Sequence, residues 1–153
     1  MDELVLRLDP AVEKKLEKNG WYKARNGDLT QTINQWNDDG YKIFNSAKFF
    51  LKSFNNLRVQ HEAYASNNQD YSYFDGIKAS RGIDPAWVLE DYFCKVKVDL
   101  LPIGLGYSEH LTYFIDPSGN FYGGYDDYFC KIGDSINSFF DNIFFKKNFE
   151  SIN

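Results

Sequence analysis

Cysteine is scarce in this sequence, and its few occurrences form neither a metal-binding nor a disulfide pattern. The 153-residue chain contains two cysteines, Cys94 and Cys130, which stand far apart and outside any Cys-x-x-Cys motif. Disulfide-rich domains and structural zinc sites use more cysteines, at closer spacing. We therefore expect two reduced thiols packed in the core, and neither a disulfide framework nor a zinc site.

Long apolar runs are also missing. No segment approaches the roughly 18 uninterrupted apolar residues of a membrane-spanning helix. The N-terminus carries Asp2 and Glu3, where a secretory signal peptide would have a basic region followed by a continuous apolar run. We expect a cytoplasmic protein that does not engage a membrane.

Basic residues are rare in the later part of the chain. The formal net charge is −5, and Lys131 is the only Lys or Arg between Val98 and Phe145. The same segment contains the acidic residues Asp99, Glu109, Asp116, Asp126, Asp127, Asp134 and Asp141. A nucleic-acid-binding domain would show clustered Lys and Arg instead, so nucleic acid is not expected as a direct partner. Two interpretations stay open: a solubilising surface, and a face that meets a basic partner.

No arrangement of residues in the sequence indicates catalysis. The two histidines, His61 and His110, fall on expected strands with no Cys or His at metal-ligand spacing. Residues 108–110 (Ser-Glu-His) have the residue types of a hydrolase triad, but neighbours on a strand point to opposite faces. Asp126 and Asp127 are adjacent, which does not give two carboxylates the opposed geometry of a glycosidase. We expect no enzymatic activity, no cofactor and no bound metal.

Aromatic residues, in contrast, are abundant. Phe, Tyr and Trp make up 18% of the chain, with 14 Phe, 11 Tyr and 3 Trp. This number of rings indicates a core built largely from them, and it leaves Tyr and Trp available as anchors of a protein interface. A chain of this length is expected to fold as one domain, residues 1–153.

Helix signals are most frequent in the first third of the chain. They are a capping Asp before proline at residues 9–10, the capping-box pattern of Asp28 with Gln31, and a capping Asn45. Apolar residues at helical spacing follow each signal. We expect helices from residue 10 to Gly20, from 29 to Gly40 and from 46 to Phe54.

Two more helices are expected later in the chain. Asp84-Pro85 repeats the start signal and opens a helix that runs through Phe93. From Ile136 to Phe144, apolar residues repeat at i, i+3, i+4, i+7 and i+8, which is the clearest helical pattern in the sequence. Asp, Asn and Ser on its polar face favour a helix that covers a sheet over one that lies on a membrane.

Strand patterns fill the remaining segments. Residues 57–62 alternate apolar and polar side chains, and residues 71–78 supply a partner strand across a polar loop at 66–69. Pro102 is expected to end regular strand pairing. Further strands are expected over residues 96–100, 110–115 and 120–125.

Residues 116–127 (DPSGNFYGGYDD) combine turn and strand signals. The first four match a type I turn, with Asp at position i, Pro at i+1 and Gly at i+3. The calcium loop of an EF-hand would need Gly at its sixth position and Glu at its twelfth, where this stretch has Phe and Asp. Gly123-Gly124 within a strand indicates a bulge or the close approach of another group to the backbone.

Apolar and glycine motifs follow one another in a distinctive order between about residues 10 and 145. They are Leu16-x-x-Asn19-Gly20-Trp21 with Arg25, Trp36-x-x-x-Gly40-Tyr41, Phe44-x-x-Ala47-x-x-Phe50-Leu51-x-x-Phe54-x-x-Leu57-x-Val59, Phe74-Asp75, Leu101-Pro102-Ile103-Gly104 and Asp116-x-x-Gly119-x-Phe121-Tyr122. In order and spacing they resemble the SUKH superfamily, and most closely its third subgroup of immunity proteins. Two positions depart from that pattern: Lys23-Ala24 stands where Pro-Gly is common, and Asn55-Asn56 where Gly-Gly is common. Asn adopts positive φ more readily than most residues, so the second departure preserves the expected backbone.

The resemblance implies an α+β fold, a twisted antiparallel sheet flanked by helices, here with helices concentrated in the N-terminal third plus one C-terminal helix. It implies a bacterial, cytosolic immunity protein that neutralises a cognate polymorphic toxin by binding its C-terminal toxic domain. It does not name the toxin, because such proteins are paired with nucleases, deaminases and other activities. The first alternative is a SUKH-type regulatory module that binds another protein and has no toxin partner, and the second is a small hydrolase.

Five residues in the acidic segment are our candidates for the toxin-binding face: Glu109, Tyr122, Tyr125, Asp126 and Asp127. Aromatic anchors flanked by carboxylates suit a basic, nucleic-acid-handling toxin, because rings contribute contact area and acids speed the encounter. The alternative is that Tyr122 packs in the core and the acids only solvate the end of a strand.

Overall fold

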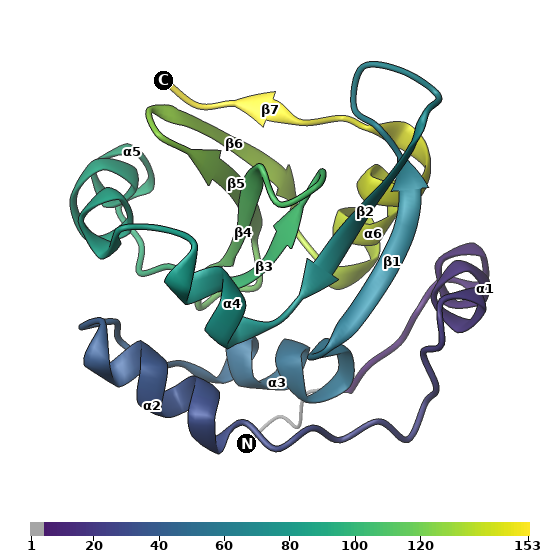
Figure 1. The fold of residues 1–153 in the computed structure, drawn as a ribbon, viewed down its shortest axis with the longest axis horizontal. Coiled ribbons are helices and arrows are strands. Elements are labelled where there is room, and N and C mark those ends of the chain that lie inside the picture. Colours follow the sequence, from purple (N-terminus) through teal and green to yellow (C-terminus); the bar gives the residue numbers. More distant parts are fainter. Residues whose placement is uncertain (1–4) are drawn as a thin grey trace.

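The protein has an α+β fold in which one antiparallel sheet is covered by helices on both faces (Figure 1). The computed structural model describes residues 5–153. Within these residues the seven strands, in sheet order, are β1 (Leu57–Glu62), β2 (Gln69–Phe74), β3 (Leu101–Gly106), β4 (Leu111–Ile115), β5 (Phe121–Tyr125), β6 (Tyr128–Gly133) and β7 (Glu150–Ser151). The helices are α1 (Pro10–Lys18), α2 (Thr30–Asp38), α3 (Asn45–Phe54), α4 (Gly76–Arg81), η1 (Trp87–Tyr92), α5 (Phe93–Val96), α6 (Ile136–Asp141) and η2 (Asn142–Lys146), of which η1 and η2 are π-helical.

Each strand pairs with the strand that follows it in the chain, so four of the connections are hairpins or short loops. The connection from β2 to β3 carries α4, η1 and α5, and the connection from β6 to β7 carries α6 and η2. The sheet curls strongly, and α6 with η2 lies in its hollow, against β6 on one side and β1 on the other (Figure 1).

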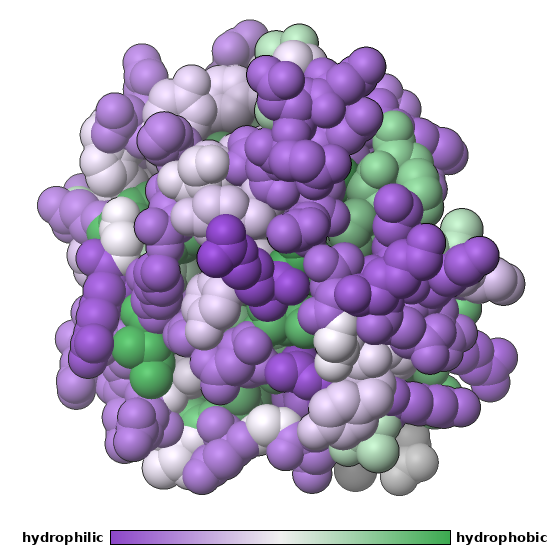
Figure 2. Space-filling view, turned by 45° about the vertical axis from the view of Figure 1, so that its right-hand side comes forward, coloured by the Kyte–Doolittle hydropathy of each residue, from purple (hydrophilic) through white to green (hydrophobic). Residues whose placement is uncertain are grey.

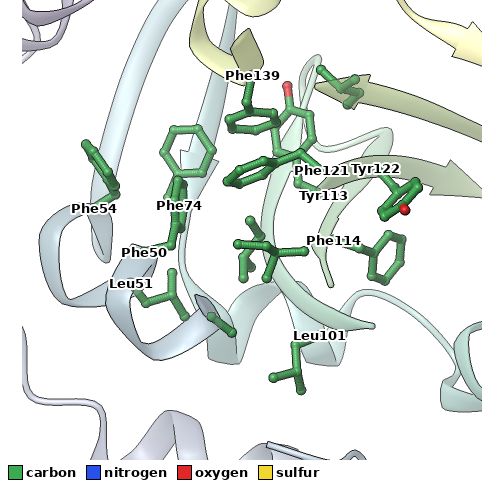
Figure 3. Close-up of a cluster of buried hydrophobic side chains, with 14 of the residues drawn as sticks. Phe50, Leu51, Phe54, Phe74, Leu101, Tyr113, Phe114, Phe121, Tyr122 and Phe139 are labelled. Atoms are coloured by element: carbon green, nitrogen blue, oxygen red, sulfur yellow. The ribbon is translucent and has the colours of Figure 1, made fainter. Parts of the chain in front are cut away.

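One face of the sheet packs against α3 and α6 through phenylalanine rings. Phe139 of α6 stacks on Phe121 of β5 with ring centroids 4.3 Å apart, and Phe50 of α3 meets the same ring edge-on at 5.3 Å. Figure 3 shows these rings converging in the centre of the molecule. Phe139 and Phe140 are both fully buried, which confirms the helix predicted from Ile136 to Phe144.

The opposite face of the sheet packs against η1. Tyr92 stacks on Phe129 of β6 at 4.5 Å, and Tyr122 of β5 stacks on the same ring at 5.3 Å. Figure 3 shows Tyr122 beside Phe114, on the other side of the strands from Phe139. A Cβ atom at Gly124 would lie 2.8 Å from the Tyr92 ring, so the close approach predicted at Gly123-Gly124 is confirmed and the approaching group is Tyr92.

The turn predicted at residues 116–119 is present and is built around Asp116. The backbone N–H of Gly119 donates to the carbonyl oxygen of Asp116 at 3.0 Å, as a β-turn requires. The Asp116 carboxylate is only 2% exposed. It accepts hydrogen bonds from the backbone N–H of Ser118, from both the backbone and the side chain of Asn120, and from the Tyr122 hydroxyl. Asp116 therefore stabilises a turn and is not available to a ligand.

The three N-terminal helices and the strand over 57–62 are confirmed, but three caps differ from the prediction. Asp9 stands at the N-cap of α1, but its side chain makes no capping hydrogen bond. Asp28 accepts from the backbone N–H of Thr30 and forms no capping box with Gln31, so α2 begins at Thr30. Asn45 is the first residue of α3 and makes no capping hydrogen bond. Asn56 adopts φ +64°, the left-handed backbone expected where the family pattern has glycine.

The helices are not concentrated in the N-terminal third, which corrects that part of the fold prediction. The helix predicted after Asp84-Pro85 is present as η1 and α5, and α4 was not predicted. Residues 71–78 are strand only as far as Phe74, because Asp75 then caps α4 by accepting from the backbone N–H groups of Ile77 and Lys78.

The strand predicted over residues 96–100 is wrong. Helix α5 extends through Val96 and ends at Lys97 in the left-handed conformation, and Val96 and Val98 pack against the core from a helix end and a loop. Pro102 lies inside β3, since a register shift between Pro102 and Gly104 accommodates the missing N–H. Strands β3, β6 and β7 were not predicted.

Two further expectations concern the thiols and the membrane. Cys130 is buried, as predicted, but Cys94 is exposed on α5, which corrects the expectation of two core thiols. In the part of the chain that the structure describes, no helix is long and apolar enough to cross a membrane.

Candidate binding site

Several connections of the sheet gather at one of its ends, because antiparallel strands reverse direction at each hairpin. They are the β1–β2 loop (residues 63–68), the β3–β4 turn (107–110) and the β5–β6 turn (126–127). The segment before β7 (147–149) approaches from the opposite end of its strand and joins them through Phe149, which packs against Tyr64 and Tyr107. Figure 1 shows the β1–β2 loop and β7 at the top of the molecule, with α2 and α3 at the bottom. This end of the sheet lies opposite α2 and α3.

The connections surround an aromatic pocket of about 280 Å³. Its lining is Tyr64, Tyr107, His110, Leu111, Tyr125, Tyr128 and Phe149, which we call the aromatic pocket residues. Tyr64 and Tyr125 are 50% and 51% exposed, so two large rings face solvent at its mouth. The face shown in Figure 2 is, by comparison, mostly hydrophilic, with hydrophobic residues in small separate groups.

The pocket rings form two groups. Tyr64 lies 5.0 Å from Phe149, and Phe149 meets Tyr107 edge-on at 5.8 Å. On the other side, Tyr125 and Tyr128 stack at 5.1 Å across the β5–β6 turn. Burial raises the pKa of Tyr128 to about 12, and burial also raises the pKa of Tyr107. Both hydroxyls are therefore protonated at neutral pH, and the lining carries no anionic ring.

Both turns beside the pocket contain strained backbone. Tyr107, Ser108 and Glu109 are consecutive left-handed residues, with φ of 54°, 58° and 70°, and Asp126 has φ 46°. Non-glycine residues adopt this region at a cost of about 1–3 kcal/mol each, and such residues cluster at functional sites.

The strained turns are held by contacts to neighbouring elements. Ser108 donates its hydroxyl proton to Asp70 at 2.6 Å, and Glu109 forms an ion pair with Lys78 of α4. The carbonyl oxygens of Asp126 and Asp127 accept from the Tyr92 hydroxyl at 2.7 Å and the Lys95 ammonium at 3.1 Å. These contacts restrain the turns in their strained conformation.

The β5–β6 turn carries two acidic residues in the chain between Tyr125 and Tyr128, which both line the pocket. Asp126 and Asp127 are both exposed. Within residues 5–153, neither carboxylate forms a salt bridge. The backbone of the turn is fixed while its negative charges remain available to a partner.

A buried chain of hydrogen bonds, which we call the His61 relay, lies next to the pocket. His61 Nδ1 is 2.7 Å from the carbonyl oxygen of Glu62, and His61 Nε2 is 2.7 Å from Ser72 Oγ. Ser72 Oγ is in turn 2.7 Å from the Tyr113 hydroxyl. Because a carbonyl oxygen only accepts, Nδ1 carries the proton, Ser72 donates to Nε2 and Tyr113 donates to Ser72. The Tyr107 ring lies edge-on to His61 at 4.8 Å and links the relay to the pocket.

The relay holds His61 in its neutral form. Burial lowers the pKa of His61, and this effect outweighs the hydrogen bond to Glu62 and the charge of Asp70, which favour the protonated ring. The positive charge of Lys147 acts in the same direction as burial. His61 is 5% exposed, so it belongs to the core and not to a catalytic surface. In the described residues no group of three or more His, Cys, Asp or Glu side chains is placed to hold a metal ion.

The structure brings three of the five predicted site residues together. Tyr125, Asp126 and Asp127 lie exposed at the β5–β6 turn, and Glu109 lies at the neighbouring β3–β4 turn, already paired with Lys78. Tyr122 is the exception. It is 6% exposed, stacks on Phe129 and donates to Asp116 at 2.9 Å. Tyr122 is therefore a core residue, as the alternative interpretation held.

Sequence reasoning missed most of the pocket: Tyr64, Tyr107, His110, Leu111, Tyr128 and Phe149. Tyr128 had a local signal, since Tyr125 and Tyr128 flank a two-residue turn and cross-strand partners share a face. The others come from segments that only the folded sheet brings together.

The chain was also compared with known proteins. The model of the SUKH-3 immunity protein family matches residues 8–145. Searches of the curated proteins and of the solved structures returned no match. The family match covers nearly the whole chain and the same span as the motifs noted in the sequence. The chain belongs to the SUKH-3 immunity protein family.

Proposed function

We propose that this protein is a bacterial, cytosolic immunity protein that binds a cognate polymorphic toxin and blocks its toxic domain. The observation that carries the proposal is the family match over residues 8–145. The chain acts as a single domain over residues 1–153, and it acts by binding and not by catalysis.

The geometry supports a binding role at the end of the sheet that carries the aromatic pocket. Interface energy is concentrated in a few aromatic anchors near the centre of a contact, with charged residues at its rim. Tyr64 and Tyr125 are half-exposed rings of this kind, and Asp126 and Asp127 stand in the chain between Tyr125 and Tyr128. We propose this surface, with Glu109 at its edge, as the toxin-binding face.

The charge distribution favours a toxin that handles nucleic acid. The chain has a net charge of −5, and the carboxylates of the β5–β6 turn are exposed and have no salt-bridge partner among residues 5–153. A domain that binds or cleaves nucleic acid carries a basic surface. An acidic immunity protein would cover that surface and associate with it quickly.

Co-expression with the product of the neighbouring toxin gene tests the proposal. We expect the protein to co-purify with the C-terminal toxic domain, at equal stoichiometry, and to restore growth of cells that express that domain. Absence of a complex together with absence of protection would refute an immunity role and leave the regulatory alternative.

The non-catalytic part of the proposal has its own test. Purified protein is assayed against nucleic acid, peptide and glycoside substrates, and we expect no turnover. A turnover that a single carboxylate substitution abolishes would contradict the proposal.

A further inference from the structure

We propose that the aromatic pocket receives a basic side chain, Arg or Lys, of the toxin domain, and that this side chain is the central anchor of the complex. This inference rests on the proposed function, and it identifies the contact through which the protein would bind the toxin domain. Its four supports are the size of the pocket, the nature of its lining, the exposure of its mouth and the charge at its rim.

Size limits what the pocket can hold. Pockets for cofactors and drug-sized ligands span about 300–1,000 Å³ and bury most of the ligand. This pocket, at about 280 Å³, falls just below that range and opens to solvent between turns. A single long side chain presented by another protein fits this volume better than a nucleotide or coenzyme.

The lining selects for a cation. Five of the seven lining residues are Tyr or Phe, and Lys and Arg are absent from the seven. The face of an aromatic ring carries partial negative charge and attracts an ammonium or guanidinium group within about 6 Å of its centre. Arg and Lys also bring an apolar stem, which would lie against Leu111 and the ring edges.

The exposed rings at the mouth of the pocket leave it open to a partner. Tyr64 and Tyr125 expose half of their surface, although each has a neighbouring ring within about 5 Å. The strained turns fix the backbone of Tyr107 on one side and of the β5–β6 turn on the other. The pocket is therefore shaped before the partner arrives, which reduces the entropy lost on binding.

The negative charge of Asp126 and Asp127 favours a basic occupant over a purely apolar one. Asp126 and Asp127 stand between the two rings of the Tyr125–Tyr128 pair in the chain and have no salt-bridge partner within residues 5–153. Burying an apolar side chain beside two carboxylates would partly desolvate them without compensation, whereas a cation offsets that cost. A basic residue satisfies both the rings and the acids.

The experiment measures binding of the toxin domain, made inactive by substitution of its own catalytic residue, to variants of this protein by titration calorimetry. Tyr64→Ala and Tyr125→Ala should each weaken binding by about 30-fold or more, the loss typical of an interface anchor. Tyr125→Phe keeps the ring and should retain wild-type affinity within a few-fold. Tyr22→Ala is the matched control, because Tyr22 is 60% exposed and lies outside the pocket.

A second arm identifies the occupant. Each surface Arg and Lys of the toxin domain is replaced by Gln, and the affinities are combined with those of Tyr125→Ala in double-mutant cycles. We expect one basic residue to lose its effect when Tyr125 is absent, because both changes then remove the same contact.

The possible failures are distinguishable. If wild-type protein does not bind the toxin domain, the proposed function fails and this inference fails with it. If the complex forms and the pocket variants bind as tightly as Tyr22→Ala, the immunity role stands and the anchor pocket is refuted. If the pocket variants bind weakly but no basic residue couples to Tyr125, the pocket is an anchor site and the basic occupant is refuted.

Discussion

Replacing His61 by Gln should change how the stability of this protein depends on pH. In the folded protein the His61 relay requires a neutral imidazole, and burial lowers the pKa of His61 below its ordinary value of 6.5. The unfolded chain therefore binds a proton at a pH where the folded protein does not. The contribution of His61 to the free energy of unfolding is fully present above about pH 6.5 and is lost as the pH falls from there toward the lower folded-state pKa.

The size of the pH dependence follows from the single proton that His61 binds in the unfolded chain. A difference of one bound proton gives a slope of at most about 1.4 kcal/mol per pH unit. Protonation would also reverse the relay, since Nε2 would become a donor and Ser72 could no longer donate to it. Gln at position 61 does not titrate, so the variant should lose this part of the slope. It should also be less stable at pH 7.5, by about 1–2 kcal/mol, because the relay is incomplete.

Urea unfolding followed by tryptophan fluorescence, at intervals from pH 5 to pH 8, measures both quantities. Ser72→Ala is the control, because it breaks the relay but keeps the imidazole, and we expect it to keep the wild-type slope at lower overall stability. The reasoning would be refuted if wild-type protein and His61→Gln lost stability in parallel as the pH fell.

Three further predictions concern packing and association. Phe139→Ala should lower the free energy of unfolding by about 3–5 kcal/mol, whereas Phe145→Ala, at a ring that is 44% exposed on the same helical segment, should cost less than about 1 kcal/mol; equal losses in urea unfolding would place Phe139 in solvent. Gly124→Ala should cost about 1–3 kcal/mol, because the new methyl group meets the Tyr92 ring, and an unchanged melting curve would contradict the close approach. The pair Asp126→Asn and Asp127→Asn should slow association with the toxin domain, more at low salt than at high salt, and stopped-flow rates equal to wild type at every salt concentration would make these acids ordinary surface.

Much of the fold could be predicted from the sequence, where local chemistry and tertiary packing agree. Helix α3 and the segment from Ile136 to Phe144 have apolar residues at helical spacing, and these residues are the buried ones. Strand β1 alternates, and its alternate residues are buried. Such patterns are readable because one face of each element meets the core.

The secondary-structure predictions were wrong or incomplete where an element does not have one buried face and one exposed face. Strand β3 is buried on both faces, so alternation does not mark it, and the chance alternation of Val96 and Val98 predicted a strand one segment too early. In β6 the adjacent residues Phe129 and Cys130 are both buried, so its side chains do not alternate between core and solvent. Helix α4 has six residues and begins at a cap that also ends β2, which is too short for a periodic signal.

The candidate site could be predicted only in its local part. Tyr125, Asp126 and Asp127 are contiguous, so composition alone drew attention to them, and the same reasoning wrongly included Tyr122. Tyr122 belongs to the same strand but faces the helix η1 side, where it donates to Asp116. A one-residue step along a strand changes the face, and the sequence does not show which face each residue takes when both are apolar.

In the candidate site, the residues that fix the backbone are different from the residues whose side chains are exposed to a partner. Its backbone is fixed by contacts that point inward: Ser108 to Asp70, Tyr92 to the carbonyl oxygen of Asp126, and Lys95 to that of Asp127. The groups that would meet a partner point outward, since Tyr64 and Tyr125 expose half of their surface and the two carboxylates are exposed. Replacing an outward ring removes its packing on a neighbouring ring, Tyr64 on Phe149 or Tyr125 on Tyr128, but leaves these backbone contacts in place. The side chains of the proposed toxin contact can therefore change while the backbone of the turns keeps its shape.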